Sequence, residues 1–371
     1  MSMGSRRLGL MAFLVSLLLP MIVFGSPMDD HLYQGTYIRM VDEEGSVLMV
    51  SARIIEPGDQ YLTWDNRLFE VTGVEEGVAR TKFIEKVELP SDRFYLSDLL
   101  GWETAVGKTR KPQGIGIYHT HNAESYVPTD GANSINGRGG IHQVGRALAD
   151  TLRERGIPVF HDESLHLPHD RGAYRRSRAT VLRLMRKRPD AIFDVHRDAA
   201  PPDQYAVEIE KDIWVTGVQL VVGRANHNFA INRQYAQSLK RIADMIYPGL
   251  VKGIFFGRGN YNQDLTPLDV LLEVGAHTNS RDAAERGIKY FADVVDFYFY
   301  GPREDPRTAS PFGGPRGGVR TALRTLITIV VILFLGVLVF VIINSGSWDE
   351  ARERLTAYWK RLLGPDNPDG H

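Results

Sequence analysis

The chain has 371 residues, of which 43% are hydrophobic, a formal net charge of -1 and no cysteine. This length is sufficient for a large core and suggests one to three domains. The near-neutral charge gives no support for nucleic acid as the main partner. The lack of cysteine excludes disulfides and thiolate metal ligands, so any metal would have to be bound by histidines and carboxylates.

Two hydrophobic segments bracket the chain. Arg6 and Arg7 precede an apolar run over 8–24, which is typical of a secretory signal or of an uncleaved anchor. Residues 325–343 carry no charge and are long enough to span a bilayer. After them, an apolar stripe indicates a short helix on the inner membrane face. We therefore expect the residues between the two segments to face the outside of the membrane.

Residues 33–88 contain short strand-like runs separated by turn sequences, which predicts a small β-rich module. The runs lie near 37–40, 47–50, 67–71 and 78–84. They carry no constellation of catalytic residues, so we interpret them as a packing or membrane-proximal module.

From Gly114 onward, apolar runs alternate with amphipathic helical patterns. This predicts an α/β domain with a central, mostly parallel sheet flanked by helices. We expect strands near 115–118, 157–160, 191–199, 213–222, 254–256 and 269–274, and helices near 144–152, 174–188, 228–247 and 280–298. The predicted regions are a signal peptide or anchor (1–26), the β-rich module and linker (27–110), the α/β domain (111–300), a Pro/Gly linker (301–320), a transmembrane helix (321–344) and an amphipathic cytoplasmic tail (345–371).

Three potential metal ligands follow the first strand of the α/β domain. They are His119, His121 and Glu124, and an α/β sheet places its ligands at the carboxyl ends of its strands. Imidazole nitrogen and carboxylate oxygen together suit zinc. The alternative interpretation of this stretch alone is a polar loop after a strand. Three further histidines at 161, 166 and 169 lie in a loop, where substrate contact is the more reasonable expectation.

His196 ends a second apolar strand, and Glu273 lies inside a third. A buried carboxylate is costly unless it is paired or linked to a metal, and a structural ion pair is the alternative for Glu273. Three ligands, His121, Glu124 and His196, would leave a coordination position for water, as a catalytic zinc site requires. A further carboxylate beside that water fits metal-assisted amide hydrolysis.

Several motifs resemble the stage II sporulation protein P family. They are IYHTHNAESY at 117–126, FDVHRDA at 193–199 and LEVG at 272–275, joined by HD at 161–162 and YRRS at 174–177. The resemblance covers about residues 110–300. It implies a membrane-anchored, zinc-dependent peptidoglycan hydrolase of endospore-forming bacteria, similar to N-acetylmuramoyl-L-alanine amidases and credited with both amidase and endopeptidase activity. It also implies peptidoglycan as substrate and stage II sporulation proteins D and M as partners in thinning the septum during engulfment.

The resemblance also implies roles for particular residues. His121 and His196 correspond to the zinc histidines and Glu273 to the catalytic glutamate. We expect Glu124 as the third ligand, with His119 or His142 as alternatives. His142 lies at the start of a helix where related amidases place a glutamate ligand. The candidates for substrate binding are Arg197, Asn260 and Asn262.

Two other functions are compatible with the sequence. One is a membrane-tethered binding or scaffold protein whose site is degenerate, and the other is a zinc peptidase acting on protein. The presence of His121, His196 and Glu273 together favours an enzyme. The polar loops at 129–140 and 257–266 suit a branched polar substrate better than an apolar side-chain pocket.

The two hydrophobic segments generate a prediction about topology. Protease added to intact protoplasts should digest the 114–300 region and spare the tail after Ser347, because the region lies outside and the tail inside. Immunoblotting with antibodies against each part would measure this. A protected 114–300 region would contradict the predicted orientation.

Overall fold

The computed structural model describes residues 36–94, 99–100, 112–170, 172–301 and 352. The expected signal or anchor, the Pro/Gly linker, the second hydrophobic segment and the tail lie outside the described residues. Within the part that the structure describes, no helix has both the length and the apolar character needed to cross a bilayer. The described residues between 36 and 301 group together as one unit by their contacts.

One mixed sheet of eleven strands runs through the described residues, in the order β2-β1-β5-β4-β3-β12-β11-β13-β8-β6-β7. The strands β7, β6, β8 and β13 are mutually parallel in that order, β13 and β11 are antiparallel, and β11 and β12 are parallel. The expected parallel pairing is therefore present in the α/β domain, and the sheet as a whole is mixed. The strands of this sheet are β1 (Ile38–Val41), β2 (Val47–Ser51), β3 (Gln60–Thr63), β4 (Arg67–Glu75), β5 (Val78–Lys86), β6 (Ile115–Tyr118), β7 (Val159–His161), β8 (Ala191–Asp198), β11 (Val218–Gly223), β12 (Val251–Gly257) and β13 (Asp269–Ala276).

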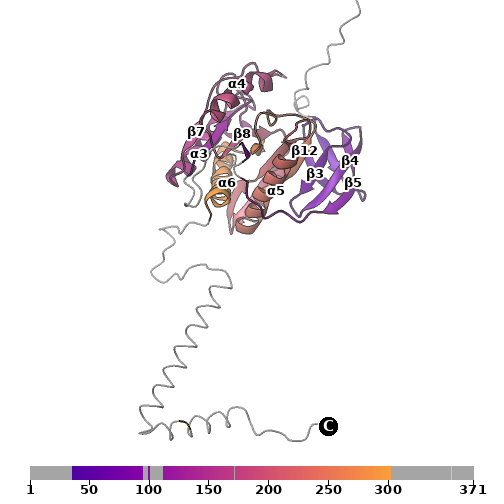
Figure 1. Ribbon diagram of the computed structural model, residues 1–371. Helices are drawn as coiled ribbons and strands as arrows, with labels where there is room; N and C mark the ends of the chain where they lie inside the picture. Colours follow the sequence, from indigo (N-terminus) through magenta and orange to yellow (C-terminus); the bar gives the residue numbers. More distant parts are fainter. Residues whose placement is uncertain (1–35, 95–98, 101–111, 171, 302–351, 353–371) are drawn as a thin grey trace, which may run out of the picture. The chain divides into compact units, whose positions relative to one another are not determined.

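The β-rich module is continuous with the rest of the sheet. The expected strands are present as β1, β2, β4 and β5, and β3 is an additional short strand between them. Strand β3 pairs antiparallel with β12, from Gly253 opposite Thr63 to Phe256 opposite Gln60. Figure 1 shows β3, β4 and β5 at one end of the sheet and β7 at the other. The module is thus an extension of the central sheet.

The expected strand over 213–222 is divided in two at Gly217. The first part, β10 (Ile213–Thr216), pairs with β9 (Ala206–Glu210) in a separate two-stranded sheet. The second part, β11, enters the central sheet. A Cβ at Gly217 would lie 2.6 Å from the Lys252 side chain, so the close approach there requires glycine.

Helices cover both faces of the α/β part of the sheet. The main core contains Ile117 and Phe193 together with residues of α3, α5 and α6, whereas Tyr118 and Ile192 pack with Val181 of α4 in a second cluster. Because successive strand residues point to opposite faces, α4 covers the face opposite to the other three helices. The helices are α2 (Val127–Asp130), α3 (Ile141–Glu154), α4 (Ala173–Met185), α5 (Phe229–Ile246) and α6 (Arg281–Tyr300), with a short 3-10 turn, η1 (Pro202–Gln204).

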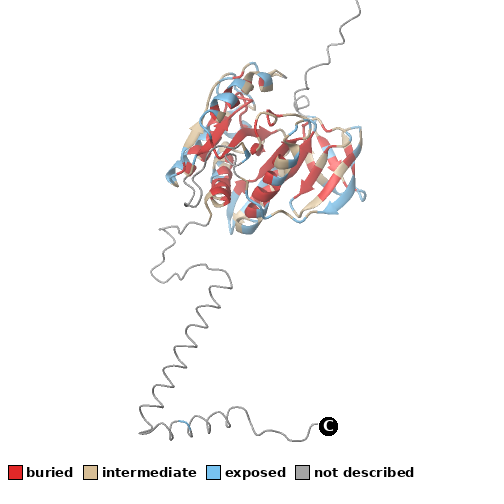
Figure 2. Ribbon diagram, in the orientation of Figure 1, coloured by how far each residue is buried: buried red, intermediate tan, exposed pale blue. Residues whose placement is uncertain are grey.

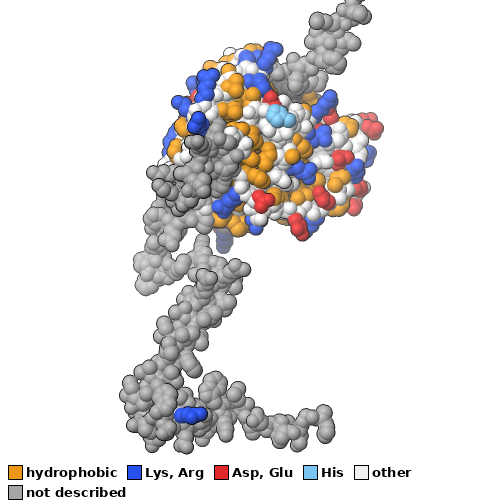
Figure 3. All heavy atoms as spheres, viewed as in Figure 1, with side chains coloured by type: hydrophobic (Ala, Val, Ile, Leu, Met, Phe, Trp, Pro, Cys, Tyr) orange, Lys and Arg blue, Asp and Glu red, His pale blue; other side chains and the backbone are white. Residues whose placement is uncertain are grey.

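The amphipathic pattern of the helices matches this arrangement. In α3 the buried positions include Val144, Leu148 and Leu152, as the apolar spacing predicts. Ser280 directly precedes helix α6, and its hydroxyl accepts a hydrogen bond from the backbone N–H of Ala283, which caps the first turn of the helix. In Figure 2, the strands at the centre of the sheet are buried along their length, whereas β5 carries mainly exposed residues beyond its first half. The visible surface in Figure 3 mixes hydrophobic, basic and acidic side chains.

Candidate metal and catalytic site

Three potential ligands come together at the carboxyl ends of β6 and β8. One atom each from His121, Glu124 and His196 lies within 4.8 Å of the others, and all three side chains are buried. Glu124 Oε1 is 3.3 Å from His121 Nδ1 and 3.4 Å from His196 Nδ1. Since β6 and β8 are parallel neighbours, with Tyr118 opposite Asp194, the loop after β6 and the end of β8 reach the same edge of the sheet.

The charges of this group are strongly coupled. Burial alone would raise the pKa of Glu124, but the His196 and Arg197 charges beside it hold that pKa well below its usual value. Burial alone would lower the pKa of His196, but Asp194 and Glu124 raise it well above its usual value. His196 therefore lies between two carboxylates that favour its protonated form. A bound cation would replace its proton, because a metal ligand must be neutral imidazole.

The donors of this group fit zinc. Two imidazole nitrogens and one carboxylate oxygen are a usual set of three protein ligands for a catalytic zinc ion. The backbone N–H of Arg197 donates to Glu124 Oε2 at 3.0 Å, which leaves Oε1 as the oxygen that faces both histidines. One atom of each of the three residues thus lies within reach of a single ion.

Asp194 is a part of the site that the sequence analysis did not identify. Its Oδ1 lies 2.9 Å from His196 Nε2, so Nδ1 of that ring faces Glu124. The backbone N–H and the hydroxyl of Thr120 both donate to the Asp194 carboxylate, at 2.8 and 2.6 Å. A carboxylate on the second ring nitrogen fixes the orientation of a ligating histidine. In the sequence, Asp194 and His196 are two positions apart on one expected strand. This spacing places both side chains on the same face of the strand.

Glu273 lies on the strand next to His196. The two residues are register partners in the parallel pair β13–β8, so their side chains point to the same face of the sheet. Burial raises the pKa of Glu273 to about 8, against the lowering effect of Arg53, which forms a buried ion pair with Glu273 Oε1. The expected alternative for Glu273, an ion pair, is thus present within the same group. Gly275 follows with φ of 69°, which favours glycine, and the strand pairing shifts between Glu273 and Ala276.

The two alternative ligands lie in a neighbouring group of histidines. His119 Nε2 is 2.9 Å from His161 Nε2, and His119 Nδ1 donates to the carbonyl of Val195. The His142 ring is 4.7 Å from the His119 ring, and His142 Nδ1 is 3.4 Å from Glu163 Oε1. Among the described residues, the group with metal-ligand geometry contains neither His119 nor His142.

The three candidates for substrate binding have different surroundings. Arg197 is buried, and its side chain donates to the carbonyls of Ser125 and Asn133, so it holds the polar loop after β6 in place. Asn262 is also buried and donates to the hydroxyl of Ser177 in α4. Asn260 is partly exposed in the loop after β12.

Two aromatic rings from the neighbourhood of α4 lie against the candidate ligands. The His169 ring is 4.4 Å from the His121 ring, and the Tyr174 ring is 5.3 Å from it. Tyr174 also stacks on His196 at 6.3 Å. Of the three loop histidines expected to contact substrate, His169 is the one whose ring lies against a candidate ligand. His161 contacts His119, and His166 contacts Thr180.

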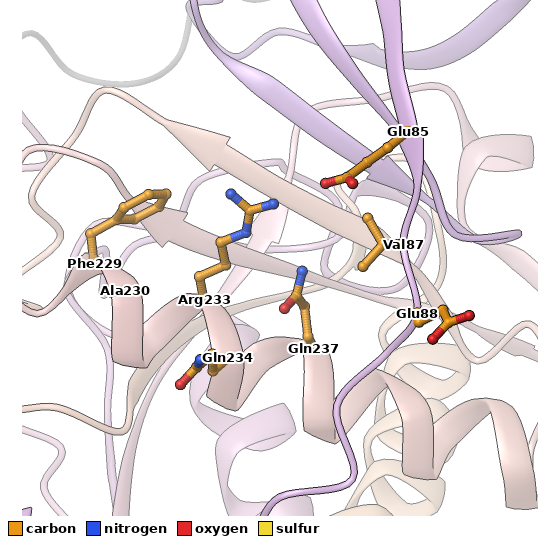
Figure 4. Close-up of a pocket in the computed structure, with 8 residues that line it drawn as sticks. All are labelled: Glu85, Val87, Glu88, Phe229, Ala230, Arg233, Gln234 and Gln237. Carbon is orange, nitrogen blue, oxygen red and sulfur yellow. The ribbon is translucent and has the colours of Figure 1, made fainter.

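A surface cavity of about 460 Å³ lies away from this chemistry. Figure 4 shows its lining, which combines the end of β5 and the residues after it with one side of α5. None of the candidate ligands lines it. The lining residues are Glu85, Val87, Glu88, Phe229, Ala230, Arg233, Gln234 and Gln237.

Several solved structures are similar to part of the chain. The N-acetylmuramoyl-L-alanine amidase AmiC2 of Nostoc punctiforme is 15% identical, over 50% of this chain and 97% of that one, with a TM-score of 0.29. Ami1 from Mycobacterium smegmatis is 18% identical, over 51% and 95%, with a TM-score of 0.31. The CwlD amidase from Clostridioides difficile, solved in complex with the GerS lipoprotein, is 14% identical, over 50% and 98%, with a TM-score of 0.32. Likeness at this level says nothing about the chemistry of the chain.

Sequence similarity gives a firmer result. Stage II sporulation protein P of Bacillus subtilis (strain 168) is 31% identical over 205 residues, which are 50% of this chain and 51% of that protein. The chain therefore matches about half of the length of this curated relative. The family model of stage II sporulation protein P (SpoIIP) matches residues 74–296, which is more than half of the chain and includes His121, Glu124, His196 and Glu273. The chain belongs to the stage II sporulation protein P family.

Proposed function

We propose that this protein is a zinc-dependent peptidoglycan hydrolase that cleaves the N-acetylmuramoyl-L-alanine amide bond. The observation that carries the proposal is the buried group of His121, Glu124 and His196, with Glu273 on the adjacent strand. Membership of the stage II sporulation protein P family supports a role in septal cell-wall degradation during sporulation and engulfment. Endopeptidase activity on the peptide stems is part of the same proposal.

In this proposal, His121, Glu124 and His196 hold a zinc ion. When bound, the ion would supply the activation of a water molecule at neutral pH and the polarisation of the scissile carbonyl. The Asp194 carboxylate lies against His196 Nε2, so Nδ1 would be the nitrogen that binds the ion. The buried position of all three ligands excludes bulk water, so the charges act in a medium of low polarity.

Glu273 is the general base and, later, the general acid. Its carboxylate accepts the proton of the attacking water and then delivers it to the nitrogen of the leaving amine. Such a group works best when its pKa lies near the working pH, and burial raises the pKa of Glu273 to about 8. The surroundings of Glu273 therefore favour transient protonation.

The surface loops and the family support a proposal for the substrate and the location. The loops at 129–140 and 257–266 are polar, which suits a branched sugar–peptide substrate. We propose that the protein is anchored in the cell membrane with its catalytic region outside, and that stage II sporulation proteins D and M are its partners. The alternatives, a scaffold with a degenerate site and a peptidase acting on protein, differ from this proposal in the products that they release.

The first prediction tests the proposal directly. Purified full-length protein should contain about one zinc per chain and should release peptide stems from purified peptidoglycan. His121→Ala and His196→Ala should each remove the metal and the activity together, because both histidines are ligands. Metal analysis and mass spectrometry of the products measure this, with His227→Ala at an exposed histidine as the control. Zinc-loaded protein that leaves peptidoglycan intact would support a scaffold, and unchanged zinc in both variants would contradict the ligand assignment.

A second prediction concerns Asp194. Asp194→Asn should weaken zinc binding by about 10- to 100-fold, because the amide no longer holds His196 as a carboxylate does. Competition with a chromophoric chelator measures the affinity. Asp190→Asn is the matched control, since Asp190 is also buried and directly precedes the same strand at its other end. Equal zinc affinity in the two variants would show that Asp194 does not orient the ligand.

A third prediction separates the base from the ligands. Glu273→Gln keeps the shape of the side chain and removes its capacity to accept a proton. Zinc content should stay near the wild-type value, while the rate should fall by about two to four orders of magnitude. Glu210→Gln, at an exposed position, is the control. Loss of zinc would make Glu273 a ligand instead, and full activity would remove it from the mechanism.

A further inference from the structure

The N-terminal β-rich module contributes a charged side chain to the site. Arg53 lies two residues after the end of β2, and only 1% of it is exposed. Its Nη2 forms an ion pair with Glu273 Oε1, although the two residues are 220 positions apart in the sequence. Its guanidinium also lies over the Phe255 ring, 5.4 Å from the ring centre. A residue from outside the strands that supply the ligands therefore contacts the proposed base.

Hydrogen bonds fix the backbone at Arg53 against the end of β8. The N–H of Ala52 donates to the carbonyl of Ala199 at 2.7 Å, and the Ser51 hydroxyl donates to Asp198 Oδ1 at 2.8 Å. The N–H of Arg53 donates in turn to the Ser51 hydroxyl at 3.0 Å. The position of the guanidinium is thus set by the same strand that carries His196.

The ion pair is not needed to attach the module. Strand β3 already pairs with β12, and the hydrogen bonds of Ser51 and Ala52 add further attachment. A buried ion pair contributes little net stability, since removing two charges from water costs about as much as their attraction returns. The nearby Asp198 carboxylate accepts from neutral donors, including Ser51 and the Tyr205 hydroxyl. The pairing of Arg53 with Glu273 therefore calls for a functional explanation.

The geometry at Glu273 provides one. Arg53 contacts Oε1, and Oε2 has no hydrogen-bond partner among the described residues. A single contact of this kind fixes the carboxylate and leaves one oxygen able to accept a proton. We propose that Arg53 is a positioning residue that orients the Glu273 carboxylate for proton transfer, a role that rests on the proposed function. The β-rich module is then a structural part of the active site.

The proposal is tested with the full-length protein and a soluble N-acetylmuramoyl-L-alanyl peptide. Arg53→Met should lower kcat by about 10- to 100-fold, because a misplaced base costs a rate factor of this order. KM should stay within about twofold and zinc content should stay near wild type, whereas the unfolding temperature should fall because the buried Glu273 carboxylate loses its charged partner. In a Glu273→Gln background, Arg53→Met should change kcat by less than about twofold, since Arg53 acts through Glu273. Arg53→Lys should give a kcat between those of wild type and Arg53→Met with unchanged KM, because an ammonium does not reproduce the planar fork.

Other outcomes would overturn the positioning role. The first is a wild-type kcat in Arg53→Met or Arg53→Lys. The second is a kcat in the Arg53→Met, Glu273→Gln double variant that is reduced by the product of the two single reductions. The third is a loss of kcat in Ser51→Ala as large as that in Arg53→Met. The Ser51→Ala variant removes one attachment of the module and keeps the guanidinium, so it controls for docking alone. If Arg53→Met does not fold, Arg53→Lys still decides the question. A wild-type protein that releases no stem peptide would overturn the proposed function itself. An active wild-type protein with the same kcat as Arg53→Met would overturn the positioning role alone.

Discussion

The parallel pairing of β6, β8 and β13 is the constraint on which the site depends. It brings the loop after β6 to the same edge as the end of β8, and it places Glu273 directly opposite His196. Because side chains alternate between the two faces of a sheet, this register also decides which residues meet. If the register of β13 slipped by one residue, an apolar neighbour would take the place of Glu273. The Glu273 carboxylate would then point to the opposite face of the sheet, where the main core lies.

Burial then sets the chemistry of the residues that the register brings together. Three carboxylates lie in the buried group, and each has a positively charged or hydrogen-bonded partner, since an isolated buried charge would be very costly. Glu124 faces His196 and accepts from the backbone of Arg197, while Asp194 faces the other nitrogen of the same ring. Glu273 differs because its partner, Arg53, comes from another part of the chain. The pKa values of Glu124 and His196 are therefore shifted by other neighbours than the pKa of Glu273.

The sequence predicted the features that depend on local patterns. Apolar runs identified the strands that precede His121 and that carry His196 and Glu273, and helical spacing identified α3 and α6. The short strand β3 was missed because its four residues include only two apolar side chains. The interruption at Gly217 was missed because an apolar run on both sides of a glycine does not reveal a change of sheet. No local pattern indicates a contact such as that of Arg53 with Glu273, which joins distant segments.

The position of Arg53 also changes the interpretation of the β-rich module. The module was expected to serve packing or attachment because its sequence carries no group of catalytic residues. The family match begins at residue 74, within β4, so it includes the ligands and Glu273 and leaves out Arg53. Yet the sheet is continuous from β3 to β12, and β2 ends against β8. The setting of the proposed base is therefore completed by strands that precede the matched region, and a fragment that began at residue 74 would retain the ligands and lose the partner of Glu273.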